Sequence, residues 1–371
     1  MSWAGRHVHS SIGHNGPVKV VYTLRHRLHH PEIESSRSGE PLEHPGRAES
    51  IRAALADDGS FDFVAPDEWG TEPIEAVHEP ALVRFLEAAW EEYQQRYGYV
   101  HDVVPDVFAL PALREGMGQA GEPADIGMRL GWWCFESTTP LTHGTYAAAR
   151  SSVDVALTAA DHVLNGDRVA YGLCSPPGHH AARAAYGGYC YFNNAAVVAN
   201  QLAIGTGAKV SVLDVDYHHG NGTQQIFYER NDVQYVSLHG DPARAYPYLT
   251  GFRDELGGGA GRGATSNYPL PENTSDDDYL AALAAACGDV AAFEPEMVVV
   301  SLGLDTYWDD PIGDLDVTTD GFEESGALVS ELGLPTVVLQ EGGCATDELG
   351  ENACRWLLGI GSTKPAEADP D

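Results

Sequence analysis

Lysine is nearly absent from this chain, occurring only as Lys19, Lys209 and Lys364. With 21 basic against 55 acidic residues, the formal net charge is −34 at pH 7. Such a surface would repel nucleic-acid phosphates and anionic lipid headgroups, so we expect neither nucleic acid nor a membrane as a partner. It could attract a cationic substrate, but the interpretation we favour is a soluble surface adapted to a salty cytosol. Charge alone therefore does not identify the substrate.

Long apolar segments and paired cysteines are also missing. No run of about 18 apolar residues occurs, which argues against a membrane span. Residues 1–17 are polar and lack the apolar core of a secretory signal, so we expect a flexible N-terminal segment and a cytoplasmic location. The six cysteines form no Cys-x-x-Cys pair, which favours reduced thiols over a zinc finger or a disulfide scaffold. The last residues, 361–371, are expected to form a disordered tail.

The segment between these ends, residues 18–360, is predicted to form a single α/β domain. Short apolar runs rich in β-branched residues are expected as strands at 18–22, 61–64, 169–174, 210–213, 233–238, 297–302 and 336–340. Helices are expected at 47–56, 80–93, 145–164, 194–204, near 224, 276–293 and 321–332. This alternation predicts a mostly parallel β-sheet with helices on both faces. Residues 98–141 show no periodicity and are expected to form a long loop insertion with a functional or interface role.

Polar, glycine-rich sequence follows five of these predicted strands. It begins at Ser175, Asp214, His239, Gly303 and Glu341, each directly after an apolar run. Open α/β sheets place their sites at the carboxyl ends of strands. We therefore expect one site assembled from five loops.

The strand ending at Leu213 carries two carboxylates and two imidazoles within six positions. Asp214, Asp216 and His218 would face the same way in an extended backbone. A divalent metal held by Asp216, His218 and Asp305 is the interpretation we favour, because three protein ligands leave a position open for water. This ligand set would suit Zn²⁺ or Fe²⁺. The plainer alternative is a group of hydrogen-bonded polar residues at strand ends.

Two adjacent histidines, His179 and His180, follow a Pro-Pro-Gly turn. A hydrolase needs a general base near the metal-activated water, and these imidazoles are the natural candidates. An isolated histidine pair is more often incidental, but the rigid turn favours a catalytic role here. The partners of each ring would set its proton affinity.

Six motifs together resemble the zinc-dependent histone deacetylase family, and most of all the bacterial acetylpolyamine amidohydrolases. They occur in the family's order from about Val18 to Leu358: Ser175-Pro-Pro-Gly-His-His-Ala181, Gly187-Gly-Tyr-Cys-Tyr-Phe-Asn-Asn194, Asp214-Val-Asp-Tyr-His-His-Gly-Asn-Gly222, Ser237-Leu-His-Gly-Asp-Pro242, Ser301-Leu-Gly-Leu-Asp305 and Glu341-Gly-Gly343. The resemblance implies the arginase–deacetylase fold. It also implies that residues 98–141 narrow the site and help to form a homodimer.

The resemblance assigns roles to residues of this chain. Asp216, His218 and Asp305 match the zinc ligands, and His180 matches the general base of the tandem histidines. Asp214 matches the aspartate behind His179, and Asn221 stands where the partner of His180 is expected. A neutral partner should leave His180 less basic than a carboxylate would. A monovalent cation site for K⁺ or Na⁺ is also implied, formed by Asp214, Asp216, His218, Ser237 and Leu238.

The substrate tunnel is implied in the same way. Tyr189 and Tyr246 match its two aromatic walls, and the Gly188 carbonyl matches the acceptor of the scissile amide N–H. Acidic residues that would recognise a distal ammonium group are missing at Gly127 and Thr138, although Glu136 lies close enough in sequence to substitute. The expected substrate is therefore an N-acylated small amine, a polyamine or an acyl-lysine-like chain.

One residue departs from the family in the reaction centre. The family places a tyrosine directly after Glu-Gly-Gly, where its hydroxyl donates to the oxyanion, but this chain has Cys344. Removing one oxyanion donor typically costs about 10²–10³ in kcat. Three alternatives follow: the thiol assists weakly, packs away from the site, or ligates the metal and blocks the water. Weak activity on simple acetyl substrates is expected, as for the class IIa histone deacetylases, which carry histidine there.

The leading hypothesis is thus a Zn²⁺-dependent amidohydrolase of deacetylase type. The alternative is a catalytically impaired protein of the same fold that binds acyl groups and acts in regulation. A two-manganese ureohydrolase is disfavoured, because the sequence after Asp305 lacks the expected Asp-x-Asp.

Overall fold

The computed structural model describes residues 3, 16–32, 41–118 and 120–362. Most of the segment predicted to be flexible, and nearly all of the predicted tail, lie outside these residues. Trp3 is described and is buried, with its indole N–H donating to Asp161 (2.9 Å) and its ring packed edge-on against Trp69. The N-terminal segment therefore contributes one anchored residue to the domain.

Eight strands form a single sheet in the described part of the chain, and every neighbouring pair is parallel. The sheet order is β2-β1-β3-β8-β7-β4-β5-β6. The strands are β1 (Lys19–Val21), β2 (Asp62–Val64), β3 (Val169–Gly172), β4 (Val210–Asp214), β5 (Val233–Gly240), β6 (Thr265–Leu270), β7 (Met297–Leu302) and β8 (Thr336–Gln340). The predicted α/β fold with a mostly parallel sheet is confirmed.

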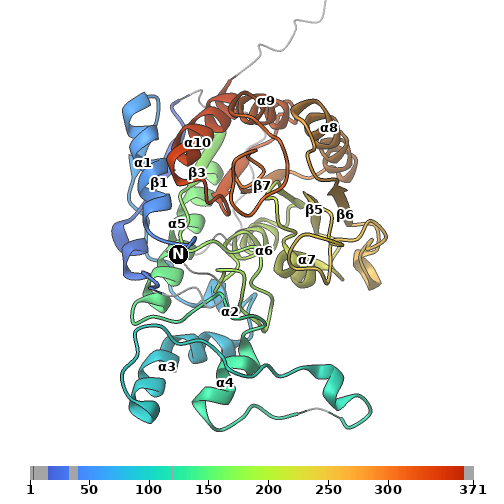
Figure 1. Cartoon of the computed structure of the whole chain (residues 1–371). Coiled ribbons are helices and arrows are strands. Elements are labelled where there is room, and N and C mark those ends of the chain that lie inside the picture. Colours follow the sequence, from blue (N-terminus) through green and yellow to red (C-terminus); the bar gives the residue numbers. More distant parts are fainter. Residues whose placement is uncertain (1–2, 4–15, 33–40, 119, 363–371) are drawn as a thin grey trace, which may run out of the picture.

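Helices cover both faces of this sheet (Figure 1). They are α1 (Gly46–Asp58), α2 (Glu72–Glu75), α3 (Pro80–Tyr97), α4 (Ile126–Trp133), α5 (Thr145–Leu164), α6 (Asn194–Thr206), α7 (Asn221–Phe227), α8 (Asp276–Phe293), α9 (Thr319–Ser330) and α10 (Thr346–Gly361). None of the helices in the described residues is long and apolar enough to cross a membrane.

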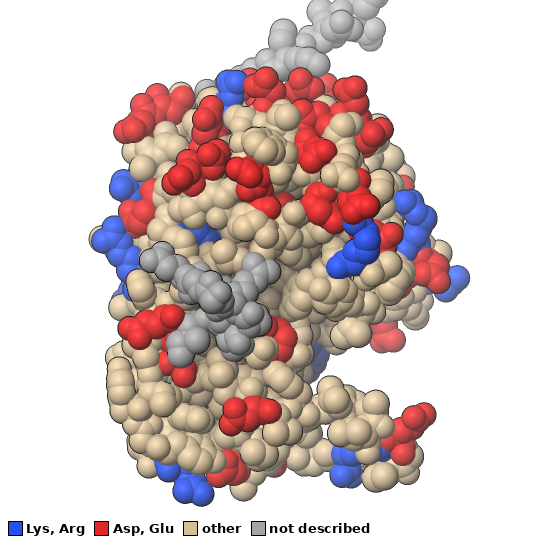
Figure 2. Space-filling model, viewed as in Figure 1, with Lys and Arg blue, Asp and Glu red and all other residues tan. Residues whose placement is uncertain are grey.

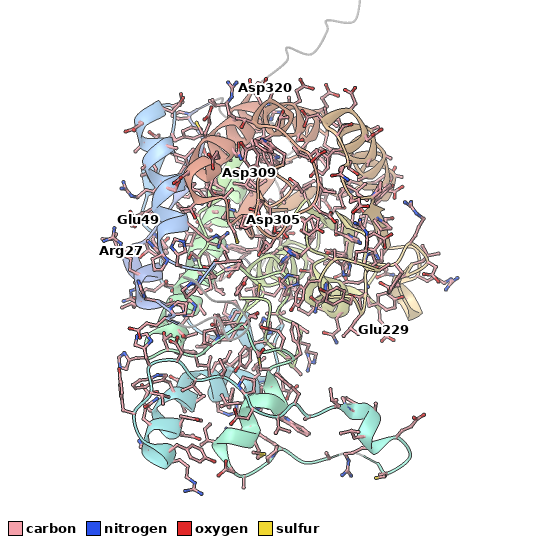
Figure 3. The ribbon with its side chains drawn as sticks, viewed as in Figure 1. Arg27, Glu49, Glu229, Asp305, Asp309 and Asp320 are labelled. Carbon is pink, nitrogen blue, oxygen red and sulfur yellow. The ribbon has the colours of Figure 1, made fainter. Side chains whose placement is uncertain are left out.

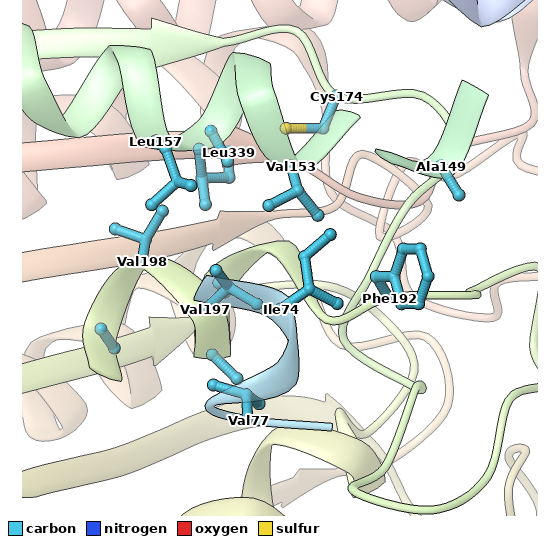
Figure 4. Packing of buried hydrophobic residues seen from close by; sticks show 14 of the residues in the cluster. Ile74, Val77, Ala149, Val153, Leu157, Cys174, Phe192, Val197, Val198 and Leu339 are labelled. Atoms are coloured by element: carbon cyan, nitrogen blue, oxygen red, sulfur yellow. The ribbon is translucent and has the colours of Figure 1, made fainter. Parts of the chain in front are cut away.

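Alternate residues of the central strands pack into two separate cores. On β7, Met297 and Val299 face the core beneath α5 and α6, whereas Val298 and Val300 face the core beneath α8, α9 and α10. Figure 4 shows part of the first core, where Val153 and Leu157 of α5 meet Val197 and Val198 of α6 around Leu339 of β8. Because the central strands are buried on both faces, they read in the sequence as continuous apolar runs.

Four of these elements were not predicted: the short helix α2, and β6, α10 and α4. The edge strand β6 contains Pro269, which lacks an N–H and is tolerated in a sheet edge, so its sequence has little strand character. Helix α10 follows the Gly-Gly-Cys turn and includes several glycines, which weaken its helical pattern. Helix α4 lies inside the segment 98–141, where Asp125 caps it by accepting from the Gly127 N–H (2.9 Å).

The segment 98–141 and helix α3 form a lobe that extends away from the sheet (Figure 1). Exposed apolar side chains are concentrated there, namely Tyr97, Tyr99, Val100, Val107, Leu110, Leu113, Met117 and Met128. By contrast, Figure 2 shows acidic residues gathered over the part of the same face formed by α8, α9 and α10. The lobe is therefore a part of the described surface that suits an apolar contact.

Candidate functional site

The five strands with polar carboxyl ends, β3, β8, β7, β4 and β5, are consecutive in the sheet. Since all are parallel, the loops that follow them meet at one edge of the sheet. They enclose a cavity of about 350 Å³. Its walls are Glu43, Arg47, Thr138, Pro177, His179, His180, Gly188, Tyr189, Asp216, Tyr217, His218, Arg244, Ala245, Tyr246, Tyr248, Asp305, Ile312, Gly342, Gly343 and Cys344. The predicted single site is thus a real cavity.

Asp216, His218 and Asp305 present one ligand atom each, and these three atoms lie within 4.8 Å of one another. The His218 Nδ1 is 2.9 Å from an Asp305 oxygen and 3.4 Å from an Asp216 oxygen. Figure 3 labels Asp305 within the body of the domain, and its side chain is fully buried. Two buried carboxylates and one imidazole that converge in this way fit a divalent cation such as Zn²⁺.

Backbone N–H groups orient these carboxylates. Asp216 accepts from the N–H of His218 (2.8 Å) and of Gly342 (2.7 Å), and Asp305 accepts from the N–H of Tyr217 (2.9 Å). Burial and the charge of Asp216 raise the pKa of Asp305 to about 7. Although burial opposes it, hydrogen bonding to the two carboxylates raises the pKa of His218 to about 9. The group therefore attracts positive charge, which a bound cation would supply.

The two tandem histidines differ in their partners and in proton affinity. The His179 Nδ1 is 3.1 Å from Asp214, whereas the His180 Nδ1 is 2.7 Å from the Asn221 side-chain oxygen. Burial opposes protonation of both rings. The carboxylates Asp216 and Asp214 nevertheless raise the pKa of His179 well above its usual value. Burial and the neighbouring histidines instead lower the pKa of His180 well below its usual value. These opposite shifts favour a neutral His180, suited to act as a base, and the protonated form of His179.

Glu341 is a functional residue that sequence reasoning missed. Its fully buried carboxylate accepts from the backbone N–H groups of Gly178 (2.6 Å) and His179 (3.1 Å). Burial raises its pKa to about 7. Glu341 therefore fixes the backbone that carries both histidines. In the sequence, Glu341 was visible only as a carboxylate directly after the predicted strand β8. Its neighbours in sequence gave no indication that it bonds to the loop that carries Gly178 and His179.

Cys344 lines the cavity and retains accessible surface, although it lies inside the domain. Its backbone N–H donates to Asp310 (2.6 Å), which also accepts from the Ala345 N–H (3.1 Å). Arg47 lies behind the same turn and donates to the carbonyls of Gly343 (2.6 Å) and Glu341 (2.7 Å). The converging ligand group in the described chain does not include Cys344. This arrangement disfavours the alternatives in which the thiol packs away or ligates the metal.

Three predicted tunnel residues, Gly188, Tyr189 and Tyr246, line the cavity. Tyr189 has a φ of 63°, a left-handed conformation that non-glycine residues rarely adopt. The Tyr246 ring packs edge-on against His180 at 5.0 Å. Tyr248, which was not predicted, has the same backbone strain with a φ of 67° and also lines the cavity.

Glu136 occupies a different position from the one expected. It is absent from the cavity walls, and its carboxylate accepts from the Gly188 N–H (3.0 Å) and from Thr138 and Thr139. These hydrogen bonds place it behind the tunnel wall, where it supports the backbone of Gly188. Thr138 lines the cavity in its place.

The residues predicted to bind a monovalent cation include Asp214, Ser237 and Leu238. Asp214 is fully buried and accepts from the Tyr235 hydroxyl (2.9 Å) as well as facing His179. The hydroxyl of Ser237 lies 2.8 Å from the His239 Nδ1. Leu238 is fully buried between them. Hydrogen bonding alone accounts for these contacts, so the cation site stays a prediction.

Comparison with known proteins agrees with the geometry. The family model of the histone deacetylase domain matches residues 41–360. Acetylpolyamine amidohydrolase 1 of Pseudomonas aeruginosa is 41% identical over 342 residues, covering 91% of this chain and 97% of the relative. The acetylpolyamine amidohydrolase of Mycoplana ramosa is 40% identical over 346 residues, covering 92% and 99%.

A crystal structure of acetylpolyamine aminohydrolase from Burkholderia pseudomallei is similar in fold, with a TM-score of 0.85 and 38% identity. The match covers 93% of this chain and 99% of that chain. The resemblance inferred from the six motifs is thereby confirmed, and the chain belongs to the histone deacetylase family.

Proposed function

We propose that this protein is a Zn²⁺-dependent amidohydrolase that hydrolyses the N-acyl amide of a small amine, a polyamine or an acyl-lysine-like chain. The observation that carries the proposal is that one cavity contains all the groups this reaction needs. Three candidate metal ligands (Asp216, His218 and Asp305), the histidine proposed as the base (His180) and two aromatic side chains (Tyr189 and Tyr246) line it together. The names of the relatives support a hydrolase of linear amides.

A Zn²⁺ ion held by Asp216, His218 and Asp305 would polarise the acyl carbonyl and lower the pKa of a water molecule. Fe²⁺ would suit the same ligands. His180 would take up a proton from the attacking water, since its ring lies in the cavity wall and its lowered pKa favours the neutral form. The protonated His179 stabilises negative charge that develops beside it, and a proton from the tandem histidines reaches the leaving nitrogen. The Gly188 carbonyl accepts the N–H of the scissile amide.

Oxyanion stabilisation is the weak part of this arrangement. A thiol at Cys344 is a shorter and poorer donor than a phenol. This difference supports the second candidate function, an acyl-group binding protein with impaired catalysis. Cys344→Tyr separates the two. A rise of about 10²–10³ in kcat on acetyl substrates indicates an impaired site, whereas good wild-type activity with no rise indicates a different working mechanism.

Three further expectations belong to this proposal. The exposed apolar side chains of the lobe support a homodimer that forms through residues 98–141. The buried carboxylate of Asp214 supports K⁺ or Na⁺ bound with Ser237 and Leu238. The six free thiols suit the reducing conditions of the cytoplasm.

The direct test is turnover by Zn²⁺-loaded protein on a panel of acyl amides, compared with His180→Ala and Asp305→Asn. Both substitutions should abolish turnover, and only Asp305→Asn should also lower the bound Zn²⁺. His30→Ala is the matched control, because His30 is exposed and lies outside the cavity. Absence of turnover on the whole panel, or an unchanged rate in His180→Ala, contradicts the proposal.

A further inference from the structure

The cavity extends beyond the cation-binding group to residues that start helix α1. Arg47 and Glu43 line this part of the cavity, and both side chains are buried as an ion pair. Ile312 and Cys344 also line the cavity, and they lie near each other because the backbone N–H groups of both donate to Asp310. We define the acyl pocket as the part of the cavity bounded by Glu43, Arg47, Ile312, Gly342, Gly343 and Cys344.

Cys344 provides the side chain that the Glu-Gly-Gly-Cys turn places in this space. A Cβ on Gly342 would lie 2.4 Å from an Asp305 oxygen, so no side chain fits there. Gly343 has a φ of 117°, and a Cβ on it would point toward Leu349 and Leu304 rather than into the cavity. Residue 344 therefore determines how much of the acyl pocket the protein itself fills.

The backbone of the turn is held from both sides, so a small residue at position 344 leaves space instead of letting the turn collapse. Asp310 receives the N–H of Cys344, and Arg47 donates to the Gly343 carbonyl. The buried Arg47–Glu43 pair sets an upper limit on the length of the acyl chain. A long apolar chain would press against the buried Arg47–Glu43 pair and disturb its hydrogen bonds, which is costly for buried charges.

From this geometry we propose that Cys344 makes the protein a hydrolase of short acyl groups longer than acetyl, with propionyl and butyryl amides as preferred substrates. The inference rests on the proposed function and specifies its substrate class. Each methylene buried against Cys344 and Ile312 should raise kcat/KM about fourfold. The gain should end where the chain reaches Arg47, so hexanoyl and octanoyl amides should be poorer than butyryl.

The experiment measures kcat/KM for N-acylputrescines from acetyl to octanoyl, which keep the amine constant. Wild-type protein should peak at propionyl or butyryl. Cys344→Phe fills the pocket without adding a hydroxyl donor, and Cys344→Tyr fills it and adds one. Both should move the optimum to acetyl, but only Cys344→Tyr should also raise acetyl turnover. Cys344→Ala is the size control and should keep the wild-type order of chain lengths.

Ile312→Phe narrows the same pocket from its other side and should lower butyryl turnover more than acetyl turnover, even if the substitutions at Cys344 prevent folding. A wild-type optimum at acetyl overturns the inference, as does a butyryl preference that survives Cys344→Phe.

If no acyl amide is hydrolysed, the proposed function fails. The affinities of the Zn²⁺-loaded protein for acetate, propionate and butyrate then decide the inference separately. The inference is supported if the affinity rises with chain length in wild-type protein but not in Ile312→Phe. It is overturned if wild-type protein binds the three carboxylates with equal affinity.

Discussion

His78 should make the stability of this protein fall as the pH drops below neutrality. The side chain is fully buried, where its Nδ1 lies 2.9 Å from the Ala182 carbonyl and its Nε2 accepts from the Asn193 N–H (2.9 Å). Burial lowers the pKa of His78 from 6.5 to about 4. The unfolded chain therefore binds a proton between these values while the folded protein does not, so stability is complete above pH 6.5 and decreases toward pH 4.

A pH of 5 lies about 1.5 units below the pKa of histidine in the unfolded chain. The free energy of unfolding at pH 5 should therefore be roughly 2 kcal/mol lower than at neutral pH because of His78 alone. Urea denaturation at a series of pH values measures this change in the free energy of unfolding. His78→Gln is the variant, and His30→Gln, at an exposed position, is the control. His78→Gln lowers stability at pH 7 because it disturbs both hydrogen bonds, but it should lose about 2 kcal/mol less than wild type between pH 7 and pH 5. Equal pH dependence in all three proteins would refute the reasoning.

Three further predictions follow from the site and the lobe. Asn221→Asp places a carboxylate where the amide oxygen now lies 2.7 Å from His180, so it should raise the pKa of that histidine and move the acidic limb of the pH–rate profile to higher pH. Removal of Zn²⁺ by a chelator should lower the free energy of unfolding by about 2.7 kcal/mol relative to protein with metal at 100 times Kd, and Asp305→Asn should remove this effect in thermal denaturation. Leu113→Glu combined with Met117→Glu should convert a dimer to a monomer in sedimentation, whereas Leu24→Glu, equally exposed but outside the lobe, should not.

The sheet, and the convergence of Asp216, His218 and Asp305, were predictable because their signals are local. Each central strand is a short apolar run, and each site residue follows such a run directly, as Asp216 follows β4 and Asp305 follows β7. The rule that parallel strands place sites at their carboxyl ends then brings these residues together without knowledge of the strand order. The order itself, with β3, β8, β7, β4 and β5 as neighbours, required the structure.

The residues that support the site could not be found in this way, because their contacts are distant in sequence. Arg47 lies 296 positions before the Gly343 carbonyl to which it donates, and Glu341 lies 163 positions after the Gly178 N–H that it accepts. For Glu136 the sequence led to the opposite mistake, because a residue that supports the backbone was interpreted as a substrate contact. A carboxylate near the expected ammonium site looked like a substrate ligand, yet four hydrogen-bond donors from Thr138, Thr139 and Gly188 satisfy it behind the tunnel wall.

The contacts around Cys344 involve the backbone of its turn. Arg47, Gln340 and Asp310 hold the backbone of the Glu-Gly-Gly-Cys turn at Gly343, Gly342 and Cys344, respectively. The same turn donates the Gly342 N–H to Asp216, so it orients the cation-binding group as well. Because side-chain identity at 344 enters none of these hydrogen bonds, a cysteine there can alter the oxyanion donor and the acyl pocket together while the metal ligands and tandem histidines keep their positions. Under the proposed function, a cysteine in place of a phenol would act twice at one point: it would weaken the stabilisation of a small acetyl oxyanion, and it would open space for a longer acyl group.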